Sequence, residues 1–179
     1  TQTAALAIAA RQHLYSWAEA EGIHFDLERR GILHIYRDKA GFEHAARVTK
    51  LLGQGGLERE AVGPDEMRRL EPNLNGEFYG GFYTPTDATG DIHKFTQGLA
   101  AAVERQGATM RYETTVEQLG TTNAGVWLKI DGEREHFDGV VVCAGVGSRA
   151  LAAKLGDRVN VYPVKGYSIT VHLDDEQSR

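Results

Sequence analysis

A short apolar run followed by closely spaced glycines is the stretch of this sequence with the clearest chemical meaning. It reads VVVCAGVGSRALAAKL over residues 140–155, and Gly145, Gly147 and Ala150 stand between the apolar run and a helical pattern. Glycines at such a turn let the main chain approach a phosphate closely, and this spacing is the outline of a dinucleotide-binding fingerprint. The motif therefore indicates a nucleotide contact.

The residues that follow the motif leave a second interpretation open. A primary fingerprint is followed by an acidic residue for the ribose at the end of the next strand, about 20 residues further on. Asp157 comes too early, and Asp174 and Asp175 stand beyond a long strand-like run that Pro163 interrupts. Small residues that only let a helix pack against a strand would produce the same pattern. The glycines of GQGG at 53–56 follow a helix and indicate its C-terminal stop.

The overall composition is that of an ordinary globular protein. The 179 residues are 41% hydrophobic and 25% charged, with a net charge of -5, so the chain is not typical of disorder. There is no basic stripe interleaved with aromatic residues, so no nucleic-acid partner is expected. No apolar run approaches the roughly 20 residues of a membrane span. We expect a soluble, cytoplasmic chain and, because it opens without methionine, the middle of a longer protein.

Cysteine and histidine usage predicts neither a disulfide nor a metal site. Cys143 is the one cysteine of the sequence, so an internal disulfide and a cysteine-based zinc site are excluded. Its place inside an apolar run predicts a buried structural thiol. The seven histidines are scattered, and His24-x-Asp26 is too short a pattern to argue for metal ligands.

The elements that must position the motif can be read from periodicity and from stop signals. Apolar residues at helical spacing, including Leu6, Leu14 and Trp17, predict a first helix that ends at Gly22. Further helices are expected around 42–52, from Pro64, and after Asp91 as N-cap. Strands are expected at 32–37 and 78–84.

The second part of the chain has a β pattern. Strands are expected at 108–113, 114–120, 126–130 and 133–138, with Asp131-Gly132 as a hairpin turn, so the last three should form an antiparallel meander. The apolar run 139–145 is typical of a parallel strand buried on both faces, and residues 159–173 predict one more long strand. The fold class is therefore α/β (α+β mixed), half of a doubly wound sheet with one crossover made of strands.

Several motifs, in order and spacing, resemble one known family. The chain is similar to the bacterial FAD-dependent D-amino acid dehydrogenases, within the superfamily of D-amino acid, glycine and sarcosine oxidases. The resemblance covers nearly the whole chain and rests on FDLERRGILHIYRD, GPDEMRRLEPNL, GGFYTPTDATGDIHKFTQGLA, VVVCAGVGSRAL and VYPVKGYSIT.

That resemblance implies a division of the chain. It implies part of a glutathione-reductase-type FAD-binding sheet with a β-meander, and part of an antiparallel substrate domain. Residues 1–78 would belong mainly to the substrate domain and its connection, 79–156 to the FAD domain, and 157–179 to the strand that returns into the substrate domain.

The resemblance also implies roles for individual residues. Main-chain atoms near Val116 would lie by the adenine, and the turn at Ala144, Gly145 and Gly147 would contact the phosphate and ribose as a secondary site. The main fingerprint and the substrate-carboxylate arginine of the family would lie outside this chain.

Further residues match the family in the segment 165–167 and in the loop that begins at residue 84. Lys165 and Gly166 would stand beside the flavin and Tyr167 on the substrate side, although Tyr167 could equally cover a sheet edge and Lys165 be a solvated charge. Thr84, Asp87 and Asp91 also match the family, but helix capping explains Asp91 completely. No residue is identified as a general base.

The implied reaction is the oxidative deamination of a D-amino acid to a 2-oxo acid and ammonia. Electrons would pass from FAD to a quinone or other respiratory acceptor, which implies a position at the inner membrane surface. Two alternatives stay open: an amine oxidase of the glycine or sarcosine type, and a catalytically silent domain that does not retain FAD because the pyrophosphate-binding helix is missing. An uncovered sheet edge and apolar face also predict self-association.

Overall fold

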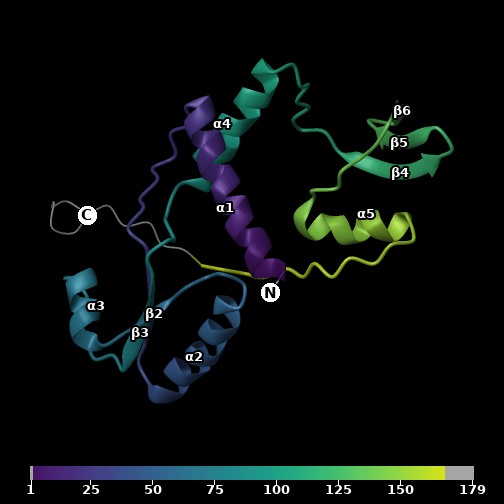
Figure 1. Cartoon of the computed structure of the whole chain (residues 1–179). Coiled ribbons are helices and arrows are strands. Elements are labelled where there is room, and N and C mark those ends of the chain that lie inside the picture. The colour runs from purple at the N-terminus through teal and green to yellow at the C-terminus, as the bar shows by residue number, and fades with distance from the viewer. Residues whose placement is uncertain (1, 168–179) are drawn as a thin grey trace. The chain divides into compact units, whose positions relative to one another are not determined.

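The computed structural model describes residues 2–167, which belong to two compact units, Thr1–Thr109 and Met110–Arg179 (Figure 1). In the part of the chain described, no helix is long and apolar enough to cross a membrane. The first unit contains α1 (Gln2–Glu21), β1 (Ile32–Tyr36), α2 (Lys39–Gly53), β2 (Glu60–Val62), α3 (Pro64–Leu70), β3 (Gly80–Thr84) and α4 (Ile92–Arg105). The second contains β4 (Val116–Thr122), β5 (Gly125–Ile130), β6 (Glu133–Phe137), the 3₁₀ turn Gly145–Gly147 and α5 (Ser148–Lys154).

The sheet of the first unit is antiparallel, in the order β1-β3-β2. His34 and Ala61 both lie opposite Phe82, so these three side chains share one face. A Cβ atom added at Gly81 would lie 2.8 Å from the carbonyl oxygen of His34. The glycine therefore allows the strands to approach, and β3 becomes the centre of the sheet. Strand β2 is too short and too polar to have been predicted from its sequence.

A hydrophobic core lies beside α1 and α4, which pack against each other. It consists of Ala18, Phe25 and Phe95, whose two rings meet edge to face at 5.3 Å between centroids. The predicted apolar stripe of α1 is only partly correct. Leu14 packs on this core, but Leu6 is 72% exposed and Trp17 49% exposed, because in an alanine-rich helix several faces are almost equally apolar.

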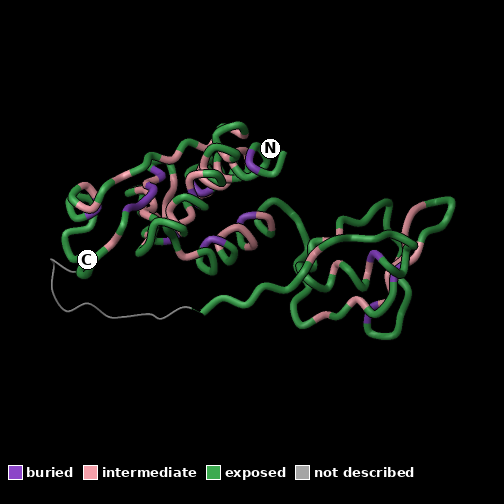
Figure 2. The backbone as a smooth tube through the Cα atoms, turned by 90° about the horizontal axis from the view of Figure 1, so that it is seen from below, coloured by how far each residue is buried: buried purple, intermediate pink, exposed green. Residues whose placement is uncertain are grey.

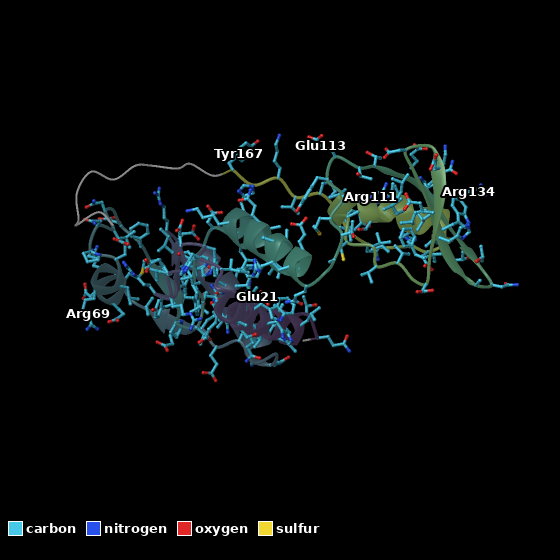
Figure 3. The ribbon with its side chains drawn as sticks, turned by 90° about the horizontal axis from the view of Figure 1, so that it is seen from above. Glu21, Arg69, Arg111, Glu113, Arg134 and Tyr167 are labelled. Carbon is cyan, nitrogen blue, oxygen red and sulfur yellow. The ribbon has the colours of Figure 1, made fainter. Side chains whose placement is uncertain are left out.

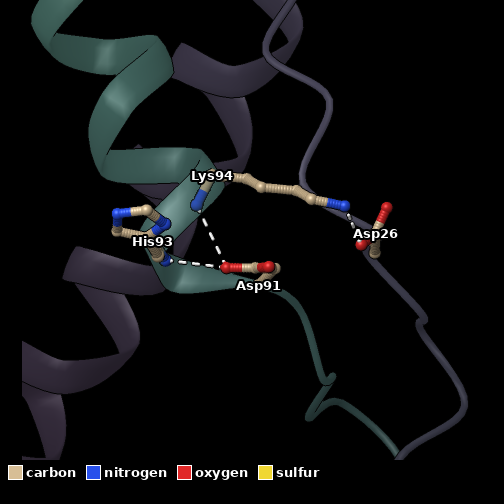
Figure 4. A network of polar contacts seen from close by, with 4 residues as sticks. All are labelled: Asp26, Asp91, His93 and Lys94. Carbon is tan, nitrogen blue, oxygen red and sulfur yellow. Dashed lines mark hydrogen bonds and ion pairs between the residues drawn. The ribbon is translucent and has the colours of Figure 1, made fainter. Parts of the chain in front are cut away.

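The predicted helix boundaries of the first unit are confirmed. Gly22 follows α1 with a φ of +65°, and Pro64 occupies the first turn of α3. The Asp91 side chain accepts hydrogen bonds from the backbone N–H groups of His93 at 2.9 Å and Lys94 at 3.0 Å, and the Lys94 ammonium pairs with Asp26 (Figure 4). These signals are local, which is why the sequence alone located them.

The second unit is built on the predicted antiparallel meander, β4-β5-β6. Asp131 and Gly132 connect β5 to β6 with φ angles of +51° and +86°, the conformation that an Asp-Gly hairpin turn requires. Leu119 and Ile130 are buried, and α5 packs on β4. Figure 2 shows how few segments of either unit are buried, because most of the tube is exposed or intermediate.

Two predicted strands are absent from the described residues, and the described part of a third forms no strand. Residues 108–113, 139–145 and 159–167 carry no strand pairing, and residues 168–173 of the last prediction lie outside the described residues. The prediction of a buried thiol is also wrong, because Cys143 is exposed and the nearby Val141 side chain is 86% exposed. Apolar character alone does not make a strand, since backbone N–H and C=O groups need a partner.

The mixed α and β class predicted from the sequence is confirmed, and both sheets among residues 2–167 are antiparallel. Strand β3 and α4 contact elements of residues 1–78, and the two compact units divide at Thr109. The assignment of 1–78, 79–156 and 157–179 to a substrate domain and an FAD domain stays a prediction.

Candidate cofactor site

The turn at Ala144–Gly147 precedes α5 in an exposed, tightly wound conformation. The Ala144 N–H donates to the Ser148 hydroxyl oxygen at 3.1 Å, and the Gly147 N–H donates to the Ala144 carbonyl oxygen at 2.9 Å. Gly145 has a φ of +53°, and a Cβ atom there would meet nothing within 4 Å. Glycine is therefore required by backbone conformation at Gly145, and the space above it is open.

The predicted adenine contact lies at the beginning of β4. Val116 is half-buried and faces Ile130 across the meander, and the pairing is irregular at the next residue. Glu117 pairs with the Lys129 ammonium at 2.8 Å and accepts the Gly132 N–H at 3.1 Å. The hydrogen bond from Lys129 is the main cause that lowers the pKa of the Glu117 carboxyl below its ordinary value.

Helix α5 separates the two predicted contacts. The Lys154 ammonium, at the C-terminal end of α5, donates to the Glu117 carbonyl oxygen at 2.7 Å. The glycine turn leads into the opposite end of this helix of seven residues, which is about 10 Å long. Helix α5 thus connects the turn to the strand that carries Val116.

Lys165, Gly166 and Tyr167 lie in an extended segment without strand pairing. Tyr167 is 89% exposed, and the Lys165 ammonium lies 5.9 Å from its ring centroid; Figure 3 shows Tyr167 on this segment. Upstream in the same segment, the Tyr162 ring meets the Arg149 guanidinium of α5 at 4.9 Å. The segment thus passes α5, but Tyr167 itself contacts no element that would fix it beside a ligand among the described residues.

The small residues at the turn fit a dinucleotide. An exposed glycine with open space above it permits the close main-chain approach that a phosphate or ribose needs. The structure therefore brings Ala144, Gly145 and Gly147 together, places Val116 on β4, against which α5 packs, and leaves Lys165 and Gly166 exposed. In residues 2–167, no group of three or more His, Cys, Asp or Glu side chains could hold a metal ion.

A charged cluster lies in the first unit, and no sequence pattern indicates it. Arg11 of α1 pairs with Asp87 at 2.7 Å, and Arg59 and His34 lie nearby. Arg11 and Asp87 are 76 positions apart. A pattern of neighbouring residues therefore cannot predict that they pair. Only the TPTDATGD match had singled out Asp87.

The comparisons with known proteins agree with one family. The family model described as "FAD dependent oxidoreductase" matches residues 1–179. D-amino acid dehydrogenase 3 of Mesorhizobium japonicum is 52% identical over 176 residues, which are 97% of this chain and 43% of that protein. D-amino acid dehydrogenase of Paramagnetospirillum magneticum is 39% identical over 97% of this chain and 42% of that protein.

Among solved structures, glycine oxidase from Geobacillus kaustophilus superposes with a TM-score of 0.69 at 23% identity, over 87% of this chain and 41% of that one. This likeness concerns the fold. The chain spans about two fifths of the length of the curated relatives that it matches. The family model matches the whole length of the chain, and the relatives share up to 52% identity with it. The chain therefore belongs to the family of FAD-dependent oxidoreductases.

Proposed function

We propose that this chain forms part of an FAD-dependent D-amino acid dehydrogenase. The observation that carries the proposal is the identity of 52% over 97% of the chain to a relative of that name. The reaction would take a hydride from the α-carbon and a proton from the amino group of a D-amino acid. The resulting imino acid is hydrolysed by water to a 2-oxo acid and ammonia.

In this proposal the residues of the second unit hold the cofactor. FAD, when bound, supplies the hydride acceptor. The open turn at Ala144, Gly145 and Gly147 would lie against its phosphate and ribose, and the main chain at Val116 against its adenine. Lys165 and Gly166 would border the flavin and Tyr167 the substrate. The protein's contribution is then position and the exclusion of water rather than a general base.

Two finer statements belong to the same proposal. Electrons would leave the flavin for a quinone or another respiratory acceptor, and the enzyme would therefore work at the inner membrane surface. The exposed apolar side chains of the second unit, Val141 and Val164 among them, would associate with a second copy of the chain.

An amine oxidase of the glycine or sarcosine type is the second candidate. The structural likeness to glycine oxidase concerns only the fold, because the identity is 23%, so it leaves this candidate open without favouring its activity. The third candidate, a folded domain that is silent by itself, is distinguished from both by cofactor binding.

The proposal is tested on a protein extended to the length of the curated relatives. The rates at which it oxidises D-alanine, L-alanine, glycine and sarcosine are measured with an artificial electron acceptor and, separately, with oxygen as the acceptor. We expect D-alanine to be oxidised at least tenfold faster than L-alanine, and the acceptor dye to be reduced faster than oxygen. Preferential oxidation of glycine or sarcosine by oxygen would support the second candidate instead.

A titration of FAD into the chain of 179 residues tests the silent-domain alternative. Calorimetry and flavin fluorescence report whether one equivalent binds. Gly145→Val, which forces a β-branched side chain into a positive φ, should weaken any binding at least tenfold. Gly22→Val, which places the same side chain at a φ of +65° in the first unit, is the control. Absence of binding would mean that the turn is a secondary contact which needs the rest of the protein.

A further inference from the structure

Asn75 and Gly76 lie in the loop that joins α3 to β3 (Figure 1). Both residues are exposed, and neither belongs to a helix or a strand. The Asn75 amide donates from Nδ2 to the Asn73 carbonyl oxygen at 3.1 Å, which is an exposed hydrogen bond and therefore contributes little net stability. The Cγ carbon of an asparagine and the backbone nitrogen of the next residue can close a five-membered ring. An exposed loop gives these two groups the freedom to meet.

Glycine is the residue that obstructs this ring closure least. It has no Cβ atom to crowd its nitrogen, and its backbone reaches conformations that other residues avoid. Gly76 has a φ of +107°, and a Cβ atom there would meet the Phe78 ring at the ordinary contact distance of 3.8 Å. The Gly76 N–H donates to no residue in the range 2–167. The attacking nitrogen is therefore not held in another contact.

Two other asparagines are followed by residues that hinder the same reaction. Leu74 follows Asn73, and its N–H donates to the Glu71 carbonyl oxygen at 3.0 Å. Val161 follows Asn160, and a side chain that branches at Cβ crowds the backbone beside it. A bulky neighbour slows the approach of the nitrogen to Cγ, and an occupied N–H slows it further. Neither asparagine therefore has the properties of Asn75.

Asn123 is the best internal comparison, because the residue after it is small and the β4–β5 turn is exposed. The N–H of that next residue, Ala124, donates to the Thr122 hydroxyl oxygen at 3.2 Å. Attack on the Asn123 amide would first have to break this hydrogen bond. The structure thus adds a second difference to the one that the neighbouring residue makes.

We propose that Asn75 is a site of spontaneous deamidation. The deprotonated Gly76 nitrogen bonds to Cγ of Asn75, the Cγ–Nδ2 bond breaks, and Nδ2 leaves as ammonia with a proton from water. One water molecule then opens the succinimide ring at either carbonyl, which gives aspartate or isoaspartate, and no electrons are exchanged. The loop gains a negative charge, and in isoaspartate the main chain also gains a carbon atom. This modification goes beyond the proposed dehydrogenase activity and requires no FAD.

The test is peptide mapping by mass spectrometry of the chain of 179 residues, incubated at neutral and at mildly alkaline pH. We expect the mass shift of an amide converted to an acid at Asn75 at least tenfold faster than at Asn73 or Asn123. The rate should rise with pH, because the attacking nitrogen must lose its proton. Chromatography of the peptide should separate an aspartyl and an isoaspartyl form.

Two variants and one control test the two reacting groups. Asn75→Gln would need a six-membered ring, and Gly76→Ala places a Cβ atom beside the nitrogen, so each should slow the conversion at residue 75 at least tenfold. Asn123→Gln is the matched control, because it removes an asparagine from another exposed turn and should leave the rate at Asn75 unchanged. Equal rates at Asn75 and Asn123 in the folded parent chain would overturn the proposal.

Unfolding in guanidinium chloride separates the structural argument from the sequence motif. It releases the Ala124 N–H from Thr122, whereas the Gly76 N–H has no partner to lose among the described residues. Unfolding should therefore accelerate the conversion at Asn123 at least fivefold more than at Asn75. Conversion of Asn75 in the unfolded chain but not in the folded one would also overturn the proposal. Amino acid oxidation is measured separately, so its outcome and this one are independent.

Discussion

At the residue scale, Asp91 shows how one side chain fixes the beginning of a helix. Its carboxylate accepts the N–H groups of His93 and Lys94, which α4 leaves without helical partners. The hydrogen bond from the Lys94 N–H is the main cause that lowers the pKa of Asp91 below its ordinary value of 3.8. The ionised carboxylate therefore stabilises the folded state more than the unfolded state.

The Asp91→Ala substitution should lower stability in a pH-dependent way. Because the folded pKa is depressed, the contribution is fully present above the unfolded pKa and is lost as the pH falls through the folded pKa. Urea unfolding of both proteins should give a clear gap in midpoint near neutral pH, and the gap should shrink as the pH falls below the ordinary pKa of aspartate and through the lowered pKa of Asp91. Asp91→Asn, a neutral cap, should keep most of the neutral-pH stability. A gap that stays constant across pH would contradict the explanation.

Met67 tests the packing of α3 on the first sheet. Its side chain is completely buried, and a Cβ atom at Gly81 would lie 3.2 Å from its sulfur atom. Met67→Ala should cost about 2–5 kcal/mol, because it removes buried groups and leaves a cavity. Leu70→Ala, on the same helix but 37% exposed, is the comparison and should cost less. Denaturant unfolding measures both, and equal costs would show that α3 is not packed as the structure describes.

At the element scale, the meander requires glycine at two positions for different physical reasons. Gly125 begins β5 with a φ of +141°, and a Cβ atom there would clash with the Phe137 carbonyl oxygen. Gly132 closes the β5–β6 turn with a φ of +86°, and a Cβ atom there meets nothing within 4 Å. The first glycine is required by space and by conformation, and the second by conformation alone.

Gly125→Ala should therefore destabilise the second unit more than Gly132→Ala. The latter should cost about 1 kcal/mol, since it only places an alanine at a positive φ. Gly125→Ala adds a clash with backbone, which can be relieved only if β6 moves away from β5. Amide hydrogen exchange of residues on β6 would show this movement. Similar protection of β6 in both variants would mean that the strands do not approach as closely as described.

At the scale of the whole molecule, apolar side chains stand exposed in the second unit. Val141 is 86% exposed and Val164 93% exposed, and neither lies in a strand or helix. Exposed apolar groups of this kind mark surfaces that bind other protein surfaces or cause aggregation. The proposed self-association rests on these side chains.

The Val141→Asp substitution should weaken that self-association. A charge placed at an apolar contact must be desolvated when two copies meet, so the dissociation constant should rise at least tenfold in sedimentation velocity experiments. Leu6→Asp, at an exposed position of the first unit, is the control and should have no effect. If the parent chain sediments as a monomer at high concentration, the association does not exist.

The features predicted correctly from the sequence are those with local causes. The cap at Asp91, the proline at the start of α3 and the Asp131-Gly132 turn each depend on residues within a few positions of one another. The family motifs are local as well, and the comparisons bear out the membership that they implied. The sequence by itself thus determined the helices, the meander and the family.

The tertiary structure decided what depends on distant partners. The apolar run at 139–145 forms no strand because nothing in the described chain pairs with its backbone, and Cys143 is exposed for the same reason. The short β2 exists because β3 offers it a partner. The sequence likewise does not show that the Ala124 N–H has a partner, whereas the Gly76 N–H has none among residues 2–167. Strand pairing and burial are properties of the partner as much as of the residue, and no local pattern encodes the partner.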